Sequence, residues 1–260
     1  MCDLEQLFKV ACEYAPIEIS HKAIEQGDYD NSGIIVNSKK EVKKVLFSLD
    51  LSIESVKKGI ELGVDTIITH HPAIYNPIKN LDIDGQNREL LLAIKSNMNV
   101  ISMHLNLDMA KLGIDHYLAV GLGADKYDVL SFVADGVGYG REFELKSDAK
   151  ALLERAIAVF GSDKIVLYGE GEVQKVASFC GSGGSHAESA VRTGQTDADL
   201  IVTSDIQHHV LKELIERGKK VMIIPHYVSE QFGFEKFYEF VKGRLEPNMT
   251  AYYFLDKRFM

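Results

Sequence analysis

The chain has 260 residues, 46% of them hydrophobic and 26% charged, which is the composition of a folded protein with one large domain or two modest ones. No apolar run approaches the ~20 residues of a membrane-spanning helix, and the acidic start lacks the basic region of a secretion signal, so we expect a cytoplasmic protein without a membrane partner. The net charge of −9 repels phosphate backbones, which disfavours nucleic acid as a partner without excluding a local basic patch.

The first half of the chain alternates amphipathic stretches with short apolar runs. Apolar residues at helical spacing predict helices over residues 4–14, 53–62, 89–96 and 114–122. The short apolar runs predict strands over residues 44–49, 64–69 and 100–103. Alternation of this kind is typical of an α/β domain with a largely parallel sheet.

The second half begins with a less regular, glycine-rich region that includes Asp135-Gly136-Val137-Gly138. We expect helices over residues 148–160, 185–192, 206–217 and 230–241. Strands are expected over residues 164–168, 175–179, 200–203, 220–224 and 251–255. The sequence thus predicts two α/β/α lobes, interleaved along the chain. Residues 1–126 and 185–260 form the metal-binding part and residues 127–184 a middle α/β region.

Strong metal ligands follow several of the predicted strands. His70-His71, His104 with Asp108, and His226 with Glu230 each come after one strand, and Asp205 with His208-His209 comes after a fourth. Ligands collect beyond the carboxyl ends of strands in open α/β sheets, so we expect these side chains to converge. Each pair alone has an ordinary explanation, such as a loop feature or a pairing within one helical turn.

Five of these residues suffice for two divalent metal ions: His70, His71, Asp108, His226 and Glu230. A carboxylate can bridge two metals, whereas each imidazole binds only one. The three cysteines, Cys2, Cys12 and Cys180, are far apart and lack Cys-x-x-Cys spacing, so they predict ordinary thiols. Imidazole and carboxylate ligands suit zinc, iron, manganese, cobalt or nickel.

The sequence resembles the NIF-three-like family, also called the GTP cyclohydrolase I type 2 family. The motifs that carry the resemblance run over nearly the whole chain: Asp30-Asn31-Ser32-Gly33, Asp65-Thr66-Ile67-Ile68-Thr69-His70-His71-Pro72, His104-Leu105-Asn106-Leu107-Asp108, Gly181-Ser182-Gly183-Gly184, Ala198-Asp199-Leu200-Ile201-Val202-Thr203 with His208-His209, and His226-Tyr227-Val228-Ser229-Glu230. The length matches the short form of the family, without the inserted domain. The sequence departs from the family pattern at Tyr29 (usually Trp), at Ser204-Asp205 (usually Gly-Glu) and at Ile223-Ile224-Pro225 (commonly Asp-Ala-Gly).

The resemblance implies a fold of two α/β lobes with a dinuclear metal site in the cleft between them, assembled as a ring-like homohexamer. It also implies that one metal takes His71, Asp108 and Glu230, and the other His70, His226 and Glu230, with His104 next to these ligands.

Other residues are candidates for catalysis and phosphate binding. His104, His208 and His209 are expected to shuttle protons near neutral pH, and Asp205 to orient one of them. An alternative is that histidines on a first helical turn only cap or pack. The turn Gly181, Ser182, Gly183, Gly184 precedes a predicted helix and can present backbone N–H groups to a phosphate, although it is not a Walker loop.

Two divalent cations with two carboxylates carry a net charge of +2, which predicts attraction of an anionic small-molecule substrate. We therefore expect a metal-dependent hydrolase that acts on a nucleotide-like or phosphorylated small molecule, as in GTP cyclohydrolase type 2-like chemistry. The alternatives are a ring-shaped nucleic-acid-binding protein and a metal-binding adaptor without turnover.

Overall fold

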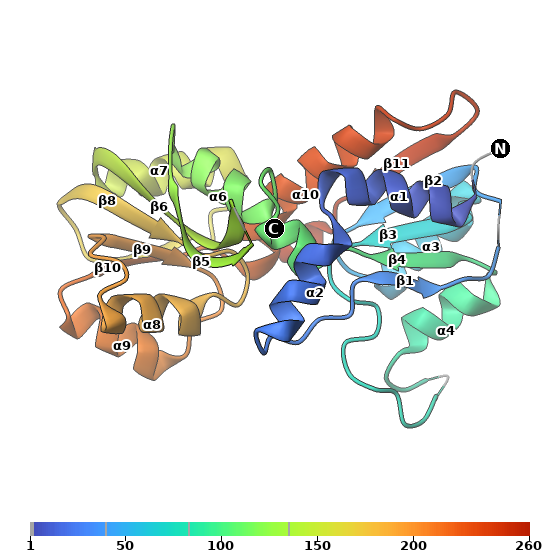
Figure 1. The fold of residues 1–260 in the computed structure, drawn as a ribbon, viewed down its shortest axis with the longest axis horizontal. Coiled ribbons are helices and arrows are strands. Elements are labelled where there is room, and N and C mark those ends of the chain that lie inside the picture. Colours follow the sequence, from blue (N-terminus) through green and yellow to red (C-terminus); the bar gives the residue numbers. More distant parts are fainter. Residues whose placement is uncertain (1–2, 40, 83, 135) are drawn as a thin grey trace. The chain divides into compact units, whose positions relative to one another are not determined.

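The computed structural model describes residues 3–39, 41–82, 84–134 and 136–260, so Cys2 and Asp135, named above, lie outside the described residues. The chain forms two compact units (Figure 1). Unit 1 comprises residues 1–110 and 234–256, and unit 2 comprises residues 111–233 and 257–260. In this division residues 127–184 belong to unit 2.

Unit 1 contains a five-stranded sheet in the order β1-β4-β3-β2-β11. Its strands are β1 (Gly33–Val36), β2 (Lys44–Ser48), β3 (Thr66–Thr69), β4 (Asn99–Ser102) and β11 (Thr250–Phe254). Only β1 runs antiparallel to its neighbour, whereas β4, β3, β2 and β11 are parallel. The carboxyl ends of β2, β3 and β4 therefore meet at one edge of the sheet.

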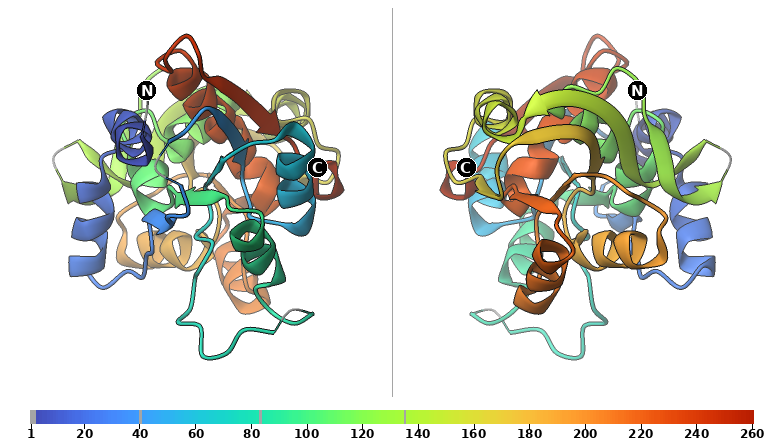
Figure 2. Two further views of the ribbon diagram at one scale, coloured as in Figure 1. Left: turned by 90° about the vertical axis from the view of Figure 1, so that its right-hand side faces the viewer. Right: turned by 90° about the vertical axis from the view of Figure 1, so that its left-hand side faces the viewer.

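Helices cover both faces of this sheet (Figures 1 and 2). They are α1 (Leu4–Tyr14), α2 (Ile17–Glu25), α3 (Ile53–Leu62), α4 (Arg88–Lys95), α5 (Leu105–Met109) and the part of α10 (His226–Lys242) that follows residue 233. On one face, Val56 of α3 and Ala93 of α4 pack with buried residues of β2, β3 and β4. On the other, the ring of Phe47 lies 6.3 Å from that of Phe234 and 5.8 Å from that of Phe237. Unit 1 is thus a three-layer sandwich.

The helix boundaries in unit 1 follow from local chemistry. Asp3 accepts a hydrogen bond from the backbone N–H of Gln6 and forms a capping box at the start of α1. Ser52 caps α3 in the same way, and Gly63, with a φ of 64°, ends that helix in the left-handed conformation that glycine adopts without strain. The predicted bounds of these two helices are confirmed.

Unit 2 contains a six-stranded sheet in the order β5-β6-β8-β9-β10-β7. Its strands are β5 (Asp128–Ala134), β6 (Val137–Asp148), β7 (Val166–Tyr168), β8 (Glu172–Ser178), β9 (Leu200–Thr203) and β10 (Lys220–Ile223). Strands β8, β9 and β10 are parallel, whereas β5, β6 and β7 pair antiparallel. The largely parallel sheet expected for the first half of the chain is confirmed in unit 1, whereas the sheet of unit 2 is mixed.

The glycine-rich region explains that difference, because it forms the hairpin of β5 and β6. Gly136 has a φ of 71° at the turn. A Cβ at Gly138 would collide with the backbone of Ser131 and Phe132 on the facing strand. The glycines therefore permit close strand pairing, and they hide the alternating pattern by which strands are usually predicted.

Helices also cover both faces of the sheet in unit 2. Helices α6 (Ile114–Leu122) and α7 (Ala149–Phe160) lie on one face, and α8 (Gly184–Thr193) and α9 (His208–Glu216) lie on the other (Figure 1). A short 3-10 helix, Lys257–Phe259, is also part of this unit. The predicted α/β class is confirmed in both units. Among the described residues, no helix has the length and hydrophobicity required to cross a bilayer.

Candidate metal centre

The carboxyl ends of β3 and β4 bring three candidate ligands together in unit 1. His70 follows β3 directly, His104 follows β4 after one residue, and Asp108 lies on α5. The candidate ligand atoms of these three side chains all lie within 4.8 Å of one another. Nε2 of His70 is 3.4 Å from Oδ1 of Asp108. This cluster has the composition and spacing to hold a metal ion.

Oxygen atoms hold the far side of each imidazole ring in unit 1. Nδ1 of His70 lies 2.8 Å from the backbone oxygen of Met103. Nδ1 of His71 lies 2.7 Å from Oδ1 of Asp50, and Nδ1 of His104 lies 2.8 Å from Oδ1 of Asp30. Hydrogen bonds of this kind select the tautomer with the proton on Nδ1, so that Nε2 can coordinate a metal.

Asp30 is fixed as a carboxylate. Burial raises its pKa, but hydrogen bonds from His104, Ser20 and Ser32 outweigh burial and lower the pKa from 3.8 to about 2. Ser32 also accepts a hydrogen bond from the backbone N–H of His104, at 2.9 Å. Two residues of the Asp30-Asn31-Ser32 segment therefore position His104 through its ring and its backbone.

Unit 2 also contains a histidine whose Nδ1 is hydrogen-bonded to a carboxylate, at the start of α10. The helix begins at His226, so His226 and Glu230 lie on one face, as their spacing predicts. Nδ1 of His226 is 2.7 Å from Oδ2 of Asp205, and Nε2 is 3.0 Å from Oε1 of Glu230. Ser182 donates a hydrogen bond to the same oxygen of Asp205, at 3.0 Å.

In unit 2, Gly181 fits tightly against the carboxylate of Glu230. Gly181 has a φ of 53°, and a Cβ at this position would overlap Oε1 of Glu230 and lie 3.4 Å from Nε2 of His226. The loop is fixed from behind, because Asp115 accepts a hydrogen bond from the backbone N–H of Cys180 and Ser229 accepts one from Gly181. Only glycine leaves room for the carboxylate of Glu230 here.

Family comparison explains why these motifs occur together. The family model for Duf34/NIF3 (NGG1p interacting factor 3) matches residues 4–257. The chain belongs to the Duf34/NIF3 family. It is 28% identical over 254 residues to a GTP cyclohydrolase 1 type 2 homolog from Clostridium perfringens, covering 95% of this chain and 94% of that one. It is 28% identical over 222 residues to the NIF3 homolog of Schizosaccharomyces pombe, covering 78% of each.

Solved structures of this family share the fold. A Bacillus cereus protein related to NIF3 matches with a TM-score of 0.83 at 19% identity, covering 98% of this chain and 97% of that one. Reduced HcgD from Methanocaldococcus jannaschii matches with a TM-score of 0.80 at 27% identity, covering 96% and 97%. The resemblance inferred from the motifs is confirmed.

The structure of this Duf34/NIF3 chain also locates the predicted catalytic residues. His104 lies in the cluster with His70 and Asp108. Oδ2 of Asp205 contacts Nδ1 of His226, a predicted metal ligand, and the expected orientation of a proton shuttle by Asp205 stays a prediction. His208 and His209 are exposed on the first turn of α9. Their catalytic role stays a prediction.

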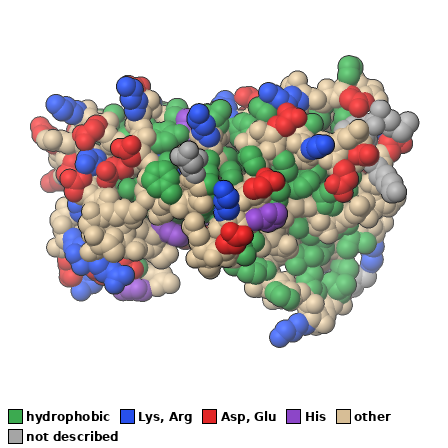
Figure 3. Space-filling view, in the orientation of Figure 1, with side chains coloured by type: hydrophobic (Ala, Val, Ile, Leu, Met, Phe, Trp, Pro, Cys, Tyr) green, Lys and Arg blue, Asp and Glu red, His purple; other side chains and the backbone are tan. Residues whose placement is uncertain are grey.

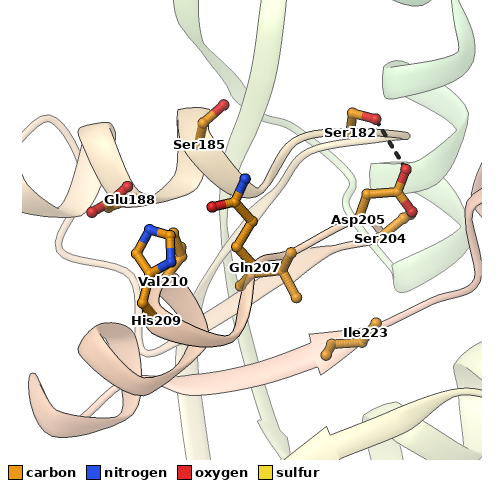
Figure 4. A pocket seen from close by; sticks show the side chains of 10 residues that line it. Ser182, Ser185, Glu188, Ser204, Asp205, Gln207, His209, Val210 and Ile223 are labelled. Carbon is orange, nitrogen blue, oxygen red and sulfur yellow. Dashed lines mark hydrogen bonds between the residues drawn. The ribbon is translucent and has the colours of Figure 1, made fainter.

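His209 and Asp205 line a cavity of about 660 Å³ in unit 2, together with Ser182, Ser185, Glu188, Ser204, Ile206, Gln207, Val210 and Ile223 (Figure 4). Glu188 and Asp205 make this cavity acidic. An anionic group therefore cannot rely on the charge of the cavity wall.

The predicted phosphate turn, Gly181 to Gly184, makes its own hydrogen bonds. The backbone N–H of Gly183 donates to the backbone oxygen of Gly181, at 2.9 Å. The backbone N–H of Gly184 donates to the backbone oxygen of Asp205, at 3.3 Å. With the bond from Gly181 to Ser229, three N–H groups of the turn have partners within unit 2. A phosphate would compete with these bonds, so the phosphate-binding role also stays a prediction.

Sequence reasoning missed two carboxylates, Asp30 and Asp50. Asp50 comes two residues after β2, which lies beside β3 in the sheet, so the same strand-end argument would have found it. Asp30 was named only as part of a family motif. Its pairing with His104 joins residues 74 positions apart and has no local signal.

Sequence reasoning set two carboxylates, Asp108 and Glu230, against two divalent cations. In unit 1, Asp30 and Asp50 also hydrogen-bond to His104 and His71, and in unit 2 Asp205 hydrogen-bonds to His226. If two divalent cations are held by these residues, the sum of +4 and −5 gives −1 rather than +2. The attraction of an anionic substrate stays a prediction.

Proposed function

We propose that this protein binds two divalent metal ions through His70, His71, Asp108, His226 and Glu230 and uses them to hydrolyse a phosphorylated, nucleotide-like small molecule. One observation carries the proposal. Four histidines, His70, His71, His104 and His226, have Nδ1 2.7 or 2.8 Å from a backbone carbonyl or carboxylate oxygen, and three of those oxygens belong to carboxylates. Metal-binding histidines characteristically have this outer hydrogen bond.

A histidine with another environment provides a contrast. Nδ1 of His116 lies 2.7 Å from the hydroxyl of Tyr127, and burial together with the charge of Arg141 lowers its pKa. A neutral ring packed among aromatic residues is an ordinary structural histidine. The carboxylate-bound histidines differ from it in the way that metal ligation requires.

The residues present fit divalent metals. Imidazole nitrogens and carboxylate oxygens suit zinc, iron, manganese, cobalt or nickel, and Cys12 and Cys180 are not among the candidate ligands. The ligand atom of His104 groups with those of His70 and Asp108, which makes His104 a further candidate ligand. The close approach of Gly181 to Glu230 keeps that carboxylate in place beside His226.

When bound, two divalent cations supply Lewis acidity, which lowers the pKa of a water and polarises the bond that it attacks. The protein's own residues hold the protons around them. Asp30, Asp50 and Asp205 accept hydrogen bonds from the Nδ1–H groups of His104, His71 and His226, which leaves the lone pair of each Nε2 for a metal ion. The side chain of Asp205 is 59% exposed and lines the cavity described above.

The substrate class follows from coordination chemistry rather than from long-range charge. Phosphate oxygens are good ligands for divalent cations with open positions, whereas the acidic cavity wall offers no attraction of its own. The relatives that bear the name GTP cyclohydrolase 1 type 2 homolog support a nucleotide-like substrate. We further propose that the protein forms the homohexamer that the family resemblance implies. The sedimentation coefficient in a velocity experiment tests this oligomeric state.

The nucleic-acid alternative gains no support from the surface. Acidic and basic side chains are interspersed on the face drawn in Figure 3, and the net charge is −9. Sequence-independent binding to a phosphate backbone depends on clustered positive charge.

The decisive experiment is a turnover screen of the metal-loaded protein against GTP and simple phosphoesters. Glu230→Gln removes a metal-binding carboxylate and should abolish turnover with the fold intact. Glu239→Gln is the matched control, because it changes an exposed carboxylate further along the same helix. Metal binding without turnover of any substrate would support an adaptor instead, and salt-sensitive DNA binding would support the nucleic-acid alternative.

A further inference from the structure

Two exposed tyrosines lie beside the candidate metal cluster of unit 1. Tyr29 is 49% exposed and Tyr75 is 50% exposed. Their ring centroids are 5.1 Å apart in an edge-on arrangement, and the ring of Tyr75 lies 6.3 Å from that of His104. Large aromatic side chains stabilise a folded protein by burying much apolar surface. Two adjacent tyrosine rings that stay half exposed contribute less of this stabilisation. Such a pair is suited to contact a ligand.

The residues next to both tyrosines are hydrogen-bonded around the segment that positions His104. Asp30, the neighbour of Tyr29, holds Nδ1 of His104. The side-chain amide of Asn31 donates to the backbone oxygen of Ile74, the neighbour of Tyr75, at 2.7 Å. These hydrogen bonds fix the backbone beside Tyr29 and Tyr75 close to the candidate ligand His104.

A polar cavity of about 450 Å³ adjoins Tyr75. Its lining residues belong to the loop between β3 and α4, and the ribbon of this loop runs along the lower edge of Figure 1. Besides Tyr75, Lys79 and Asp82, four amide side chains line it: Asn76, Asn80, Gln86 and Asn87. Each amide offers both hydrogen-bond donors and an acceptor. That set matches the mixed donors and acceptors on the edge of a heterocyclic base, and the volume is adequate for one.

We propose that Tyr29 and Tyr75 form a stacking platform for a planar heteroaromatic ring of the substrate, whose edge is bound by the amides of this cavity. The proposal rests on the proposed function, and it narrows the substrate to phosphorylated compounds that carry a nucleobase-like ring. Tyrosine faces stack on any such ring, whereas the amides provide selectivity among rings.

The chain contains no tryptophan, which provides a direct probe. Tyr29→Trp installs a single indole on the platform, and its fluorescence can be followed in the metal-loaded protein. Titration with GMP or AMP should quench the emission, because the base stacks on the indole. Ribose 5-phosphate has the same phosphate and no ring, so it should leave the emission unchanged. Equal responses to GMP and ribose 5-phosphate would overturn the proposal.

Calorimetry of the metal-loaded protein measures the contribution of each ring. Each of the variants Tyr29→Leu and Tyr75→Leu loses the stacking of one ring on the base. Each should therefore weaken GMP binding by between about fivefold and about a hundredfold. Binding of ribose 5-phosphate should not change. Tyr168→Leu is the matched control, since Tyr168 is also exposed but belongs to β7 of unit 2. The absence of GMP binding to the wild type, or unchanged GMP affinity in both leucine variants, would overturn the platform.

These measurements separate the platform from the proposed function. Tyrosine-dependent binding of GMP without any hydrolysis would support the platform and contradict the hydrolase. Hydrolysis of ring-free phosphoesters that is indifferent to both tyrosines would support the hydrolase and contradict the platform. If dilution of the Tyr29→Trp protein shifts its emission as a complex dissociates, a second copy covers the rings, and the platform is again contradicted.

Discussion

Gly181→Ala tests how closely the protein backbone shapes the metal-binding carboxylate in unit 2. The new Cβ would overlap Oε1 of Glu230, whereas ordinary contact begins near 3.4 Å. The oxygen must withdraw by about 1 Å, several times the ~0.2 Å tolerance of a metal–ligand bond. The backbone cannot relieve the overlap, because Asp115 and Ser229 hold the loop through two hydrogen bonds.

Two effects must be separated to obtain the magnitude. Alanine at a φ of 53° costs about 1 kcal/mol of backbone strain in the folded protein. Displacement of Glu230 should lower the metal affinity by about 10- to 100-fold, which is roughly 1.4–2.8 kcal/mol of binding free energy. Gly194→Ala is the control for strain, since Gly194 has a φ of 72°, lies in the same unit and has open space around its Cβ position.

Titration of each metal-free variant with zinc or manganese, followed by calorimetry, gives the metal affinity. Thermal unfolding of the same metal-free samples gives the cost of strain, and both variants should melt about 2–4 °C below the wild type. Only Gly181→Ala should bind metal more weakly. Equal metal affinity for Gly181→Ala, Gly194→Ala and the wild type would refute the claim that the close approach of Gly181 positions the carboxylate of Glu230.

Three further predictions concern the carboxylates that hold the histidines. Asp205→Asn should lower metal affinity by about 10- to 100-fold with little effect on stability, since the hydrogen bond to His226 that it weakens is partly exposed to solvent. Unchanged affinity in the same titration would contradict this role. The pKa of Asp30 falls from 3.8 to about 2 on folding, so its carboxylate stabilises the folded protein by about 2 kcal/mol above pH 3.8, and this stabilisation is lost as the pH falls through 2. The free energies of unfolding of the metal-free wild type and of Asp30→Asn, measured with urea, should therefore converge as the pH falls through that range. A constant difference between the two proteins would argue against this role. Because five carboxylates offset the metal charge, KM for a phosphorylated substrate should change little between low and physiological salt, and a steep salt dependence would contradict the charge count.

The ends of the parallel strands could be predicted from the sequence because two local signals coincide there. Buried strands such as β3 and β9 are continuous apolar runs, and their carboxyl ends are followed by His70 and Asp205. Parallel pairing of β2, β3 and β4 then places those ends at one edge. A spacing of four residues likewise placed His226 and Glu230 on one helical face, once α10 began at His226.

Features that depend on pairing between distant residues could not be predicted. The partners of the imidazole rings, Asp30, Asp50 and Asp205, are separated from their histidines by 74, 21 and 21 positions. The strand ends mark Asp50 and Asp205 as candidates, but nothing local says which imidazole ring each carboxylate holds, and Asp30 has no such signal. Helix α2 and strand β1 were also missed. Strand β1 is four residues long and only partly buried, so it lacks a strong apolar pattern.

X-ray absorption spectroscopy of the zinc-loaded protein tests the central claim most directly. If the histidines with anchored Nδ1 atoms bind metal through Nε2, the spectrum should show nitrogen and oxygen ligands at about 2.0–2.2 Å with the outer scattering of imidazole rings. A first shell of water oxygens without imidazole scattering, or one that contains sulfur, would contradict it.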